Sequence, residues 1–175
     1  MPARKVIPKS PCSADEILAF LGTAANAPEL STYVLFLSRY GGGHVFPNSL
    51  VANEPINFEF SDPKWSLQSF VTVAKNMADH DGALQQGHWD EQFRPIGRTS
   101  AGDKVLLGVA AVNLGQVFYW TPDDDGISYR FVRVADSFEH LLDQMEYYED
   151  QGMTPPWNRM DSPDSPPAIA LDLTV

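Results

Sequence analysis

The sequence contains almost no cysteine and no long apolar run. Cys12 is the only cysteine among 175 residues, which excludes an intramolecular disulfide framework. A lone thiol fits a reducing compartment, and it also fits a secreted chain with little cysteine; we expect a cytoplasmic protein. No stretch approaches the roughly 18 apolar residues of a membrane span, and no signal-peptide core follows the first residues. We therefore expect neither a membrane segment nor a membrane partner.

Basic residues are also scarce. The chain has 12 Lys and Arg residues against 23 Asp and Glu residues, which gives a formal net charge of −11. A surface of this kind repels nucleic acid and anionic membranes, and it attracts a basic partner. Acidity also keeps a protein soluble, and composition alone does not separate these two interpretations.

Length and proline content divide the chain into three parts. A chain of 175 residues can bury roughly 70% of its unfolded surface, so a single domain is expected. Residues 1–12 are predicted to be a flexible arm, and residues 13–151 to be the folded domain. The prolines of residues 152–175 disfavour regular structure, so we expect removal of this tail to leave the domain folded. Its last part, residues 168–175, has the composition of an edge strand or of a segment that wraps the surface.

Two helices are predicted in the first quarter of the chain. Ser13 and Glu16 have capping-box spacing, and an apolar stripe of helical period follows them. Ser31 is the predicted N-cap of the second helix, which ends at the glycine run Gly41–Gly43. This run is not followed by Gly-Lys-Ser/Thr, so it predicts a helix end and a sharp reversal more than a phosphate loop.

Two further helices are predicted later in the chain. Apolar residues keep helical spacing from Ser66 to about Asp79, and residues 80–92 are predicted to be a polar surface loop. The last helix is expected to begin at Asp136, with Glu139 in capping-box spacing. Its core face is predicted to consist of four apolar residues, Phe138, Leu141, Leu142 and Met145.

A hairpin is predicted at the centre of the sheet. Residues 105–112 form an apolar run that barely alternates, which indicates a strand covered on both faces. Asn113 and Gly115 tolerate the turn that joins this run to residues 116–120, which are β-branched and aromatic. Two other strands are expected, over residues 56–60 and 127–134.

Catalytic and metal-binding patterns are weak. The four histidines are scattered along the chain, at His44, His80, His88 and His140. No spacing among them matches a zinc signature, and Cys12 has no partner cysteine. The segment from His80 to Asp90 is rich in His and Asp, which leaves a small metal-dependent hydrolase as an alternative. We expect no catalytic residue, no metal and no cofactor.

Acidic residues next to aromatic ones give two candidate surfaces for a protein partner. Tyr119 and Trp120 end a predicted strand, and Asp123, Asp124 and Asp125 follow closely. An outward-facing aromatic ring beside acids can anchor a partner. The polar side of the last helix is the second candidate, with acids at Glu139, Asp143 and Glu146.

The order of these segments resembles the SUKH superfamily, which includes fungal cell-wall-assembly regulators and many bacterial toxin-immunity proteins. The matching stretches are Pro28–Gly43, Phe93–Gly97, Gly102-Asp103, Gly115–Trp120 with Asp123 and Asp124, and Ala135–Leu142. The family usually has Leu-Pro before its second helix, whereas here Leu30 is followed by Ser31. It often has Asn before the glycines, whereas here Tyr40 precedes them.

The resemblance implies an α+β domain and a binding function. The expected fold is a mostly antiparallel, twisted sheet packed against helices. The expected function is that of a non-enzymatic immunity protein, which binds a cognate toxin domain and blocks its active site. A basic toxin would suit the acidity of this chain. A regulatory scaffold that binds a cellular partner is the alternative, as the fungal members of the superfamily suggest.

Overall fold

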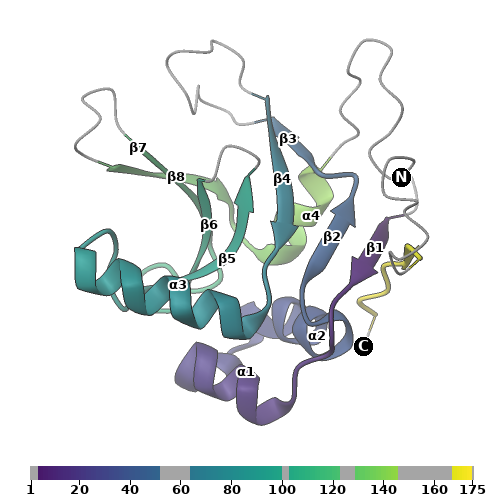
Figure 1. Cartoon of the computed structure of the whole chain (residues 1–175), viewed down its shortest axis with the longest axis horizontal. Coiled ribbons are helices and arrows are strands. Elements are labelled where there is room, and N and C mark those ends of the chain that lie inside the picture. Colours follow the sequence, from purple (N-terminus) through teal and green to yellow (C-terminus); the bar gives the residue numbers. More distant parts are fainter. Residues whose placement is uncertain (1–3, 52–63, 100–102, 123–128, 146–166, 175) are drawn as a thin grey trace.

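The chain is built around one antiparallel sheet (Figure 1). The computed structural model describes residues 4–51, 64–99, 103–122, 129–145 and 167–174. The strands follow the order β8-β7-β6-β5-β4-β2-β1-β9, and β3 pairs with the first residues of β4. All of these pairings are antiparallel, as predicted. The strands are β1 (Lys5–Pro8), β2 (Gly43–Phe46), β3 (Ser49–Val51), β4 (Lys64–Phe70), β5 (Phe93–Thr99), β6 (Lys104–Gly108), β7 (Val117–Pro122), β8 (Tyr129–Ala135) and β9 (Ile169–Ala170).

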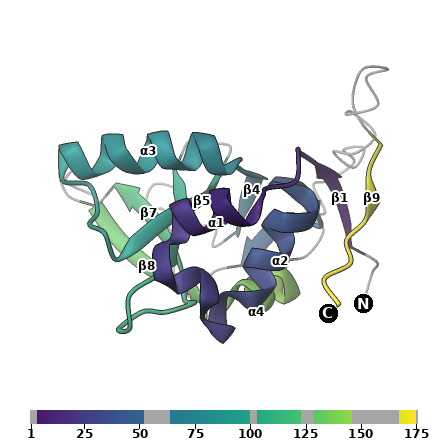
Figure 2. The ribbon, with the colours of Figure 1, turned by 90° about the horizontal axis from the view of Figure 1, so that it is seen from below.

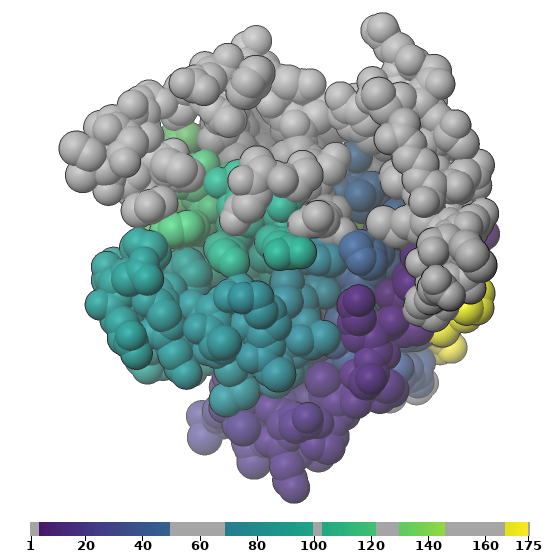
Figure 3. Space-filling model, viewed as in Figure 1, coloured from purple at the N-terminus to yellow at the C-terminus, as the bar shows by residue number. Residues whose placement is uncertain are grey.

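Helices cover both faces of the sheet. The helices of the described residues are α1 (Ala14–Leu21), α2 (Ser31–Tyr40), α3 (Val73–Gln86), α4 (Phe138–Gln144) and the short 3-10 helices η1 (Gly22–Asn26) and η2 (Pro28–Leu30). Figure 2 shows α3 along one side of the sheet, with α2 and α4 along the other. Figure 3 shows α3 next to the N-terminal residues on one face of the molecule. The predicted α+β architecture is confirmed.

β6 is buried on both faces, because two apolar clusters meet it. Val105 and Leu107 belong to the main core, which α1, α2 and α4 cover. Leu106, which points to the other face, belongs to a smaller cluster with residues of α3 and β7. Burial on both faces explains why apolar and polar residues do not alternate along β6.

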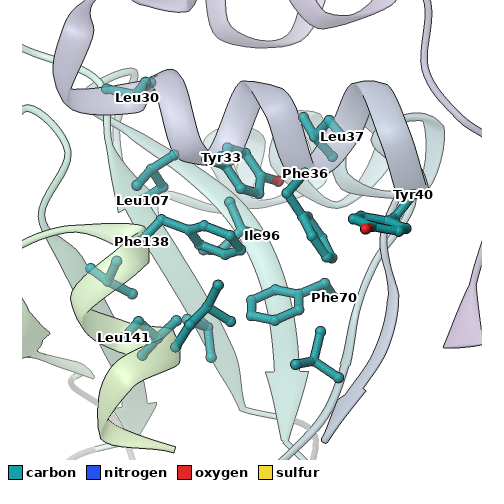
Figure 4. Close-up of a cluster of buried hydrophobic side chains, with 14 of the residues drawn as sticks. Leu30, Tyr33, Phe36, Leu37, Tyr40, Phe70, Ile96, Leu107, Phe138 and Leu141 are labelled. Atoms are coloured by element: carbon teal, nitrogen blue, oxygen red, sulfur yellow. The ribbon is translucent and has the colours of Figure 1, made fainter. Parts of the chain in front are cut away.

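Aromatic side chains fill the centre of the main core (Figure 4). Phe138 of α4 lies 4.9 Å from Tyr33 and 5.3 Å from Phe36 between ring centroids. The ring of Phe70 from β4 lies 5.1 Å from Phe138 and 5.2 Å from Phe36. These four rings come from three elements distant in sequence, so they fasten α2 and α4 to the sheet.

The prediction for the third helix is wrong in its first part. Residues from Ser66 to Phe70 belong to strand β4, and α3 begins only at Val73. Thr72 caps the helix, since its side chain accepts a hydrogen bond from the Lys75 N–H. The helix then continues to Gln86, so the surface loop predicted from residue 80 is also wrong there. The apolar spacing of the segment fitted a helix, but pairing with β5 decided the outcome.

The central hairpin is confirmed, with a shorter first strand. Val105 pairs with Tyr119, and Leu107 pairs with Val117. β6 ends at Gly108 instead of Val112, whose side chain is 76% exposed. The connection is closed by backbone hydrogen bonds, including Gly108 N–H to the Gln116 oxygen at 2.8 Å. The strand predicted for residues 127–134 corresponds to β8, and that predicted for residues 56–60 lies outside the described residues.

One of the three predicted helix N-caps is confirmed, and the other two differ by one residue or more from the prediction. Ser13 and Glu16 form the predicted capping box of α1. Ser31 is the first helical residue of α2 and not its cap, because η2 runs directly into the helix. Ser137, not Asp136, caps α4, and its side chain accepts a hydrogen bond from the His140 N–H at 3.0 Å.

Both termini belong to the sheet. Lys5–Pro8 forms β1 and pairs with β2, so the flexible arm predicted for residues 1–12 is wrong in this part. β9 extends the sheet beyond β1, with Val6 opposite Ile169. The segment after β9 is fastened to α2, because the Tyr40 hydroxyl accepts a hydrogen bond from the Asp172 N–H at 2.8 Å. Arg39 donates to the Asp172 and Thr174 carbonyl oxygens. These contacts argue against a dispensable tail.

We therefore expect removal of residues 167–175 to destabilise the domain. The deletion exposes one edge of β1 and leaves the Tyr40 hydroxyl and the Arg39 guanidinium without the hydrogen bonds described above. Losing a few partly buried hydrogen bonds costs about 1 kcal/mol each. Thermal unfolding followed by circular dichroism should show a melting temperature lower by several degrees, as a loss of this size implies. An unchanged melting temperature would show that the tail only rests on the surface.

Candidate interaction site

Strand β7 places its two candidate anchor residues on opposite faces of the sheet, and both are buried. Tyr119 points into the main core, where its hydroxyl donates to Asp103 Oδ2 at 2.5 Å. Burial, together with this hydrogen bond to a carboxylate, raises the pKa of Tyr119 well above its usual value. A neutral, buried hydroxyl of this kind stabilises the core. Tyr119 is therefore not an exposed anchor.

Trp120 lies on the other face and is also buried. Its ring packs edge-to-face on Trp89, with 5.2 Å between centroids, and lies 5.2 Å from His88. Together with Leu106 and Ala83 it forms the small cluster beneath α3. Burial therefore removes both members of the Tyr119 and Trp120 pair from the exposed surface, contrary to the expectation that they anchor a partner.

The acids predicted to surround these anchors are only partly described by the structure. Asp123, Asp124 and Asp125 follow β7 and lie outside the described residues, as does Glu146. Glu139 and Asp143 are both exposed on α4, as predicted. The two residues line a hollow between α4 and the C-terminal segment, together with Arg4, Thr32, Leu142 and residues 171–174.

One of these two acids is neutralised locally. Asp143 forms an ion pair with Arg4, whose Nη2 lies 2.5 Å from the Asp143 Oδ1, while the Nε atom of Arg4 donates to the Leu142 oxygen. Glu139 is the freer carboxylate of this face, because no comparable cation contacts it among the interactions of the described residues. The charge available to a partner on α4 is therefore smaller than the sequence suggests.

The segment from His80 to Asp90 performs a packing role. His80 is buried, and its Nδ1 accepts a hydrogen bond from the Trp89 indole N–H at 3.1 Å. Its Nε2 lies 3.3 Å from Glu91 Oε2. Burial lowers the pKa of His80 despite the opposing effect of Glu91, so the neutral ring is favoured. Among the described residues no group of three His, Cys, Asp or Glu side chains could hold a metal ion.

The sequence interpretation missed a group of partly exposed aromatic rings, which we call the aromatic patch and define as Phe93, Phe118 and Phe131. Phe93 stacks on Phe131 with 4.9 Å between centroids and meets Phe118 edge-to-face at 5.3 Å. Phe131 is 41% exposed, and the other two rings are half-buried. The sequence could have indicated Phe118, because side chains alternate along a strand and Phe118 therefore shares a face with Trp120.

A shallow hollow borders the aromatic patch. Its lining residues come from the end of α3, the following loop, β5 and β8, and they are Leu84, Gly87, His88, Trp89, Asp90, Glu91, Phe93 and Phe131. Asp90 and Glu91 are exposed at its edge. The site thus combines an apolar floor with a carboxylate rim, which is the composition of a surface that binds a protein partner.

Comparison with known proteins identifies the family. No curated protein matches the chain. Within the described ranges, every helix is too short or too polar to span a membrane. Residues 30–144, well over half of the sequence, match the SMI1 / KNR4 family (SUKH-1), and this range runs from the end of η2 to the end of α4. The chain therefore belongs to the SMI1 / KNR4 family (SUKH-1).

Proposed function

We propose that this protein is a cytoplasmic immunity protein, which neutralises a cognate bacterial toxin by binding it directly. Proteins of the SMI1 / KNR4 family are generally binding proteins without catalytic activity, and a role in protein interaction is compatible with this membership. The toxin domain is the basic partner, and binding blocks its active site without any chemical step by this chain.

The observation that supports a basic toxin is the net charge of −11. Toxins that cleave nucleic acid have basic grooves, because they must bind phosphates. An acidic inhibitor resembles that substrate in charge, and complementary charge raises the association rate. The acids available for this role include Glu139 and Asp143, which are exposed on α4, and Asp123, Asp124 and Asp125, which lie outside the described residues.

The proposal is tested by removing pairs of charges without changing side-chain shape. Asp123→Asn with Asp124→Asn, and separately Glu139→Gln with Asp143→Asn, should each slow association with the toxin domain. We expect a reduction of about threefold to tenfold at low salt and a flatter salt dependence, since exposed charges mainly act on encounter. Stopped-flow association kinetics across a salt series measure both effects.

A matched control separates local from global charge. Asp15→Asn with Glu29→Gln removes two exposed acids of α1 and η2, neither of which lines the α4 hollow. All three double variants have the same net charge, so a pair that lies in the interface must slow association more than this control. Equal rates for all three would place the interface elsewhere, and failure of the unmodified protein to bind the toxin domain would contradict the proposed function.

A further inference from the structure

One region of the sheet is not covered by any helix of the described residues. α3 covers the small cluster of Ala83, Trp89, Leu106 and Trp120. Beyond this cluster, the same face continues with the aromatic patch, whose rings come from β5, β7 and β8. Gly108 lies opposite Phe93 on the intervening strand β6 and has no side chain. The rings of Phe93, Phe118 and Phe131 therefore meet across the sheet.

The arrangement of these rings differs from that of an isolated exposed apolar residue. Leu18 on α1 is 49% exposed and is a single residue, which is common on protein surfaces. Phe131 is similarly exposed but is stacked on Phe93 and borders a hollow whose floor contains Trp89. A contiguous group of rings next to a hollow is typical of an interaction site.

Carboxylates at the edge of the hollow define the charge of its occupant. Glu91 is 73% exposed, and its charge is partly offset by Arg94, with 3.2 Å between Oε2 and Nη2. Asp90 is exposed and accepts hydrogen bonds from Gln92 within the same loop. Arg133 pairs with Phe118 in the register of β7 and β8, and it contacts Asp136, with 3.5 Å between Nη1 and Oδ1, so its charge is partly offset.

A second copy of this chain fits the site poorly. Each copy has a net charge of −11, so two copies repel each other and neither supplies a basic surface. A segment with an apolar side chain between Lys or Arg residues is complementary, because the apolar group fills the hollow while the cations meet Asp90 and Glu91. An aromatic pocket of this kind is where binding energy is concentrated in protein interfaces.

We infer that the aromatic patch and its hollow bind the basic toxin domain, with an apolar anchor of the toxin inserted between Phe131 and Trp89. This inference rests on the proposed function for the identity of the partner. It adds that the main energetic contact lies on the β5–β8 face, and that the acids of residues 90 and 91 orient the partner.

The test uses the full chain with a purified basic toxin domain, the partner class of the proposed function. Phe131→Ala should increase the dissociation constant about tenfold to thirtyfold, mainly through faster dissociation, as truncation of an anchor contact does. Leu18→Ala is the matched control, since it also removes a half-exposed apolar side chain, and it should change binding less than twofold. Circular dichroism spectra of both variants should match that of the unmodified protein.

The charge arm of the test compares two double variants of equal net charge. Asp90→Asn with Glu91→Gln should slow association, whereas Asp15→Asn with Glu29→Gln should do so less. If the toxin binds but Phe131→Ala and Leu18→Ala behave alike, the proposed surface is wrong and the proposed function stands. If Phe131→Ala instead dissociates a dimer seen by sedimentation, the occupant is a second copy and the inference fails.

A second probe tests the surface if the toxin does not bind, an outcome that contradicts the proposed function alone. This probe is a synthetic peptide with a central Leu-Trp pair between Lys and Arg residues, titrated into the isotope-labelled chain. Amide shifts confined to residues 84–93 and to Phe118 and Phe131, and lost in Phe131→Ala, would support the surface. Absent shifts, or shifts confined to the α4 hollow, would overturn it.

Discussion

Phe138→Ala is expected to lower the free energy of unfolding by about 3–5 kcal/mol, the range for removing a buried phenylalanine. Phe138 is fully buried at the start of α4, and its ring meets three other rings. Two of these come from α2 and one from β4, so the substitution leaves a cavity where three elements join. Urea denaturation followed by tryptophan fluorescence measures the loss.

The control for this prediction is Phe131→Ala. The same atoms are removed, but Phe131 is 41% exposed and touches only one other ring among the described aromatic contacts, that of Phe93. We expect it to cost about 1 kcal/mol, since the lost contact is one aromatic pair. Equal losses for the two variants would contradict the position of Phe138 at the centre of the core. The same control establishes that Phe131→Ala is folded before its binding is measured.

Local chemistry explains which elements the sequence predicted well. The Ser13–Glu16 capping box and the Gly41 helix end depend on a few adjacent residues, and both occur in the structure. Phe138, Leu141 and Leu142 are buried on the core face of α4, because helical spacing places them on one side. Met145, predicted for the same face, is buried directly after the helix ends. The sequence indicated that β6 lies inside the sheet, because its residues are apolar without polar ones between them. Burial on both faces of a strand produces that pattern.

Non-local pairing explains the errors. Phe70 satisfied a helical pattern, but its strand lies between β2 and β5, where it supplies a ring to the core. Lys5–Pro8 is too short to be identified as a strand from its own residues, and it is fixed by its partner strand β2. The strand-like composition of residues 168–175 did indicate an edge strand, and β9 pairs with β1 there. Tertiary context overrides local preference most easily in such short segments.

The candidate site also depends on contacts between segments that are distant in sequence. The sequence interpretation expected Tyr119 or Trp120 to face outward, whereas the partly exposed ring of β7 is Phe118. The burial of Trp120 depends on Trp89 and on the true extent of α3, which the sequence interpretation placed too early. The aromatic patch also needs Phe93 and Phe131 from two other strands, and their proximity follows only from the strand order.

Gly41→Ala is expected to destabilise the domain strongly, although it adds a single methyl group. Gly41 ends α2 in the left-handed region, with φ of 60°, where a side chain costs about 1–2 kcal/mol. In addition, a Cβ atom here would lie 1.7 Å from the Ser10 oxygen and 2.5 Å from the Ser10 carbonyl carbon. Both are backbone atoms, so the overlap is relieved only by moving the chain.

That movement would break the crossing of residues 9–12 over the end of α2. This crossing is held by two backbone hydrogen bonds, from the Lys9 N–H to the Tyr40 oxygen at 2.8 Å and from the Cys12 N–H to the Leu37 oxygen at 3.0 Å. β1 lies directly before the crossing, so its displacement also disturbs the pairing of β1 with β2. We therefore expect loss of several kcal/mol, within the range that marks a specific structural defect.

Gly87→Ala is the matched control, because Gly87 ends α3 with a φ of 70° and a Cβ atom there would meet nothing within 4 Å. Both variants thus carry the same backbone strain, and only Gly41→Ala adds the overlap with Ser10. The difference between their unfolding free energies isolates the overlap, and it should exceed the whole cost of Gly87→Ala. If the two variants lose the same stability, residues 9–12 do not pass this close to the end of α2, and the glycine run serves only to end the helix.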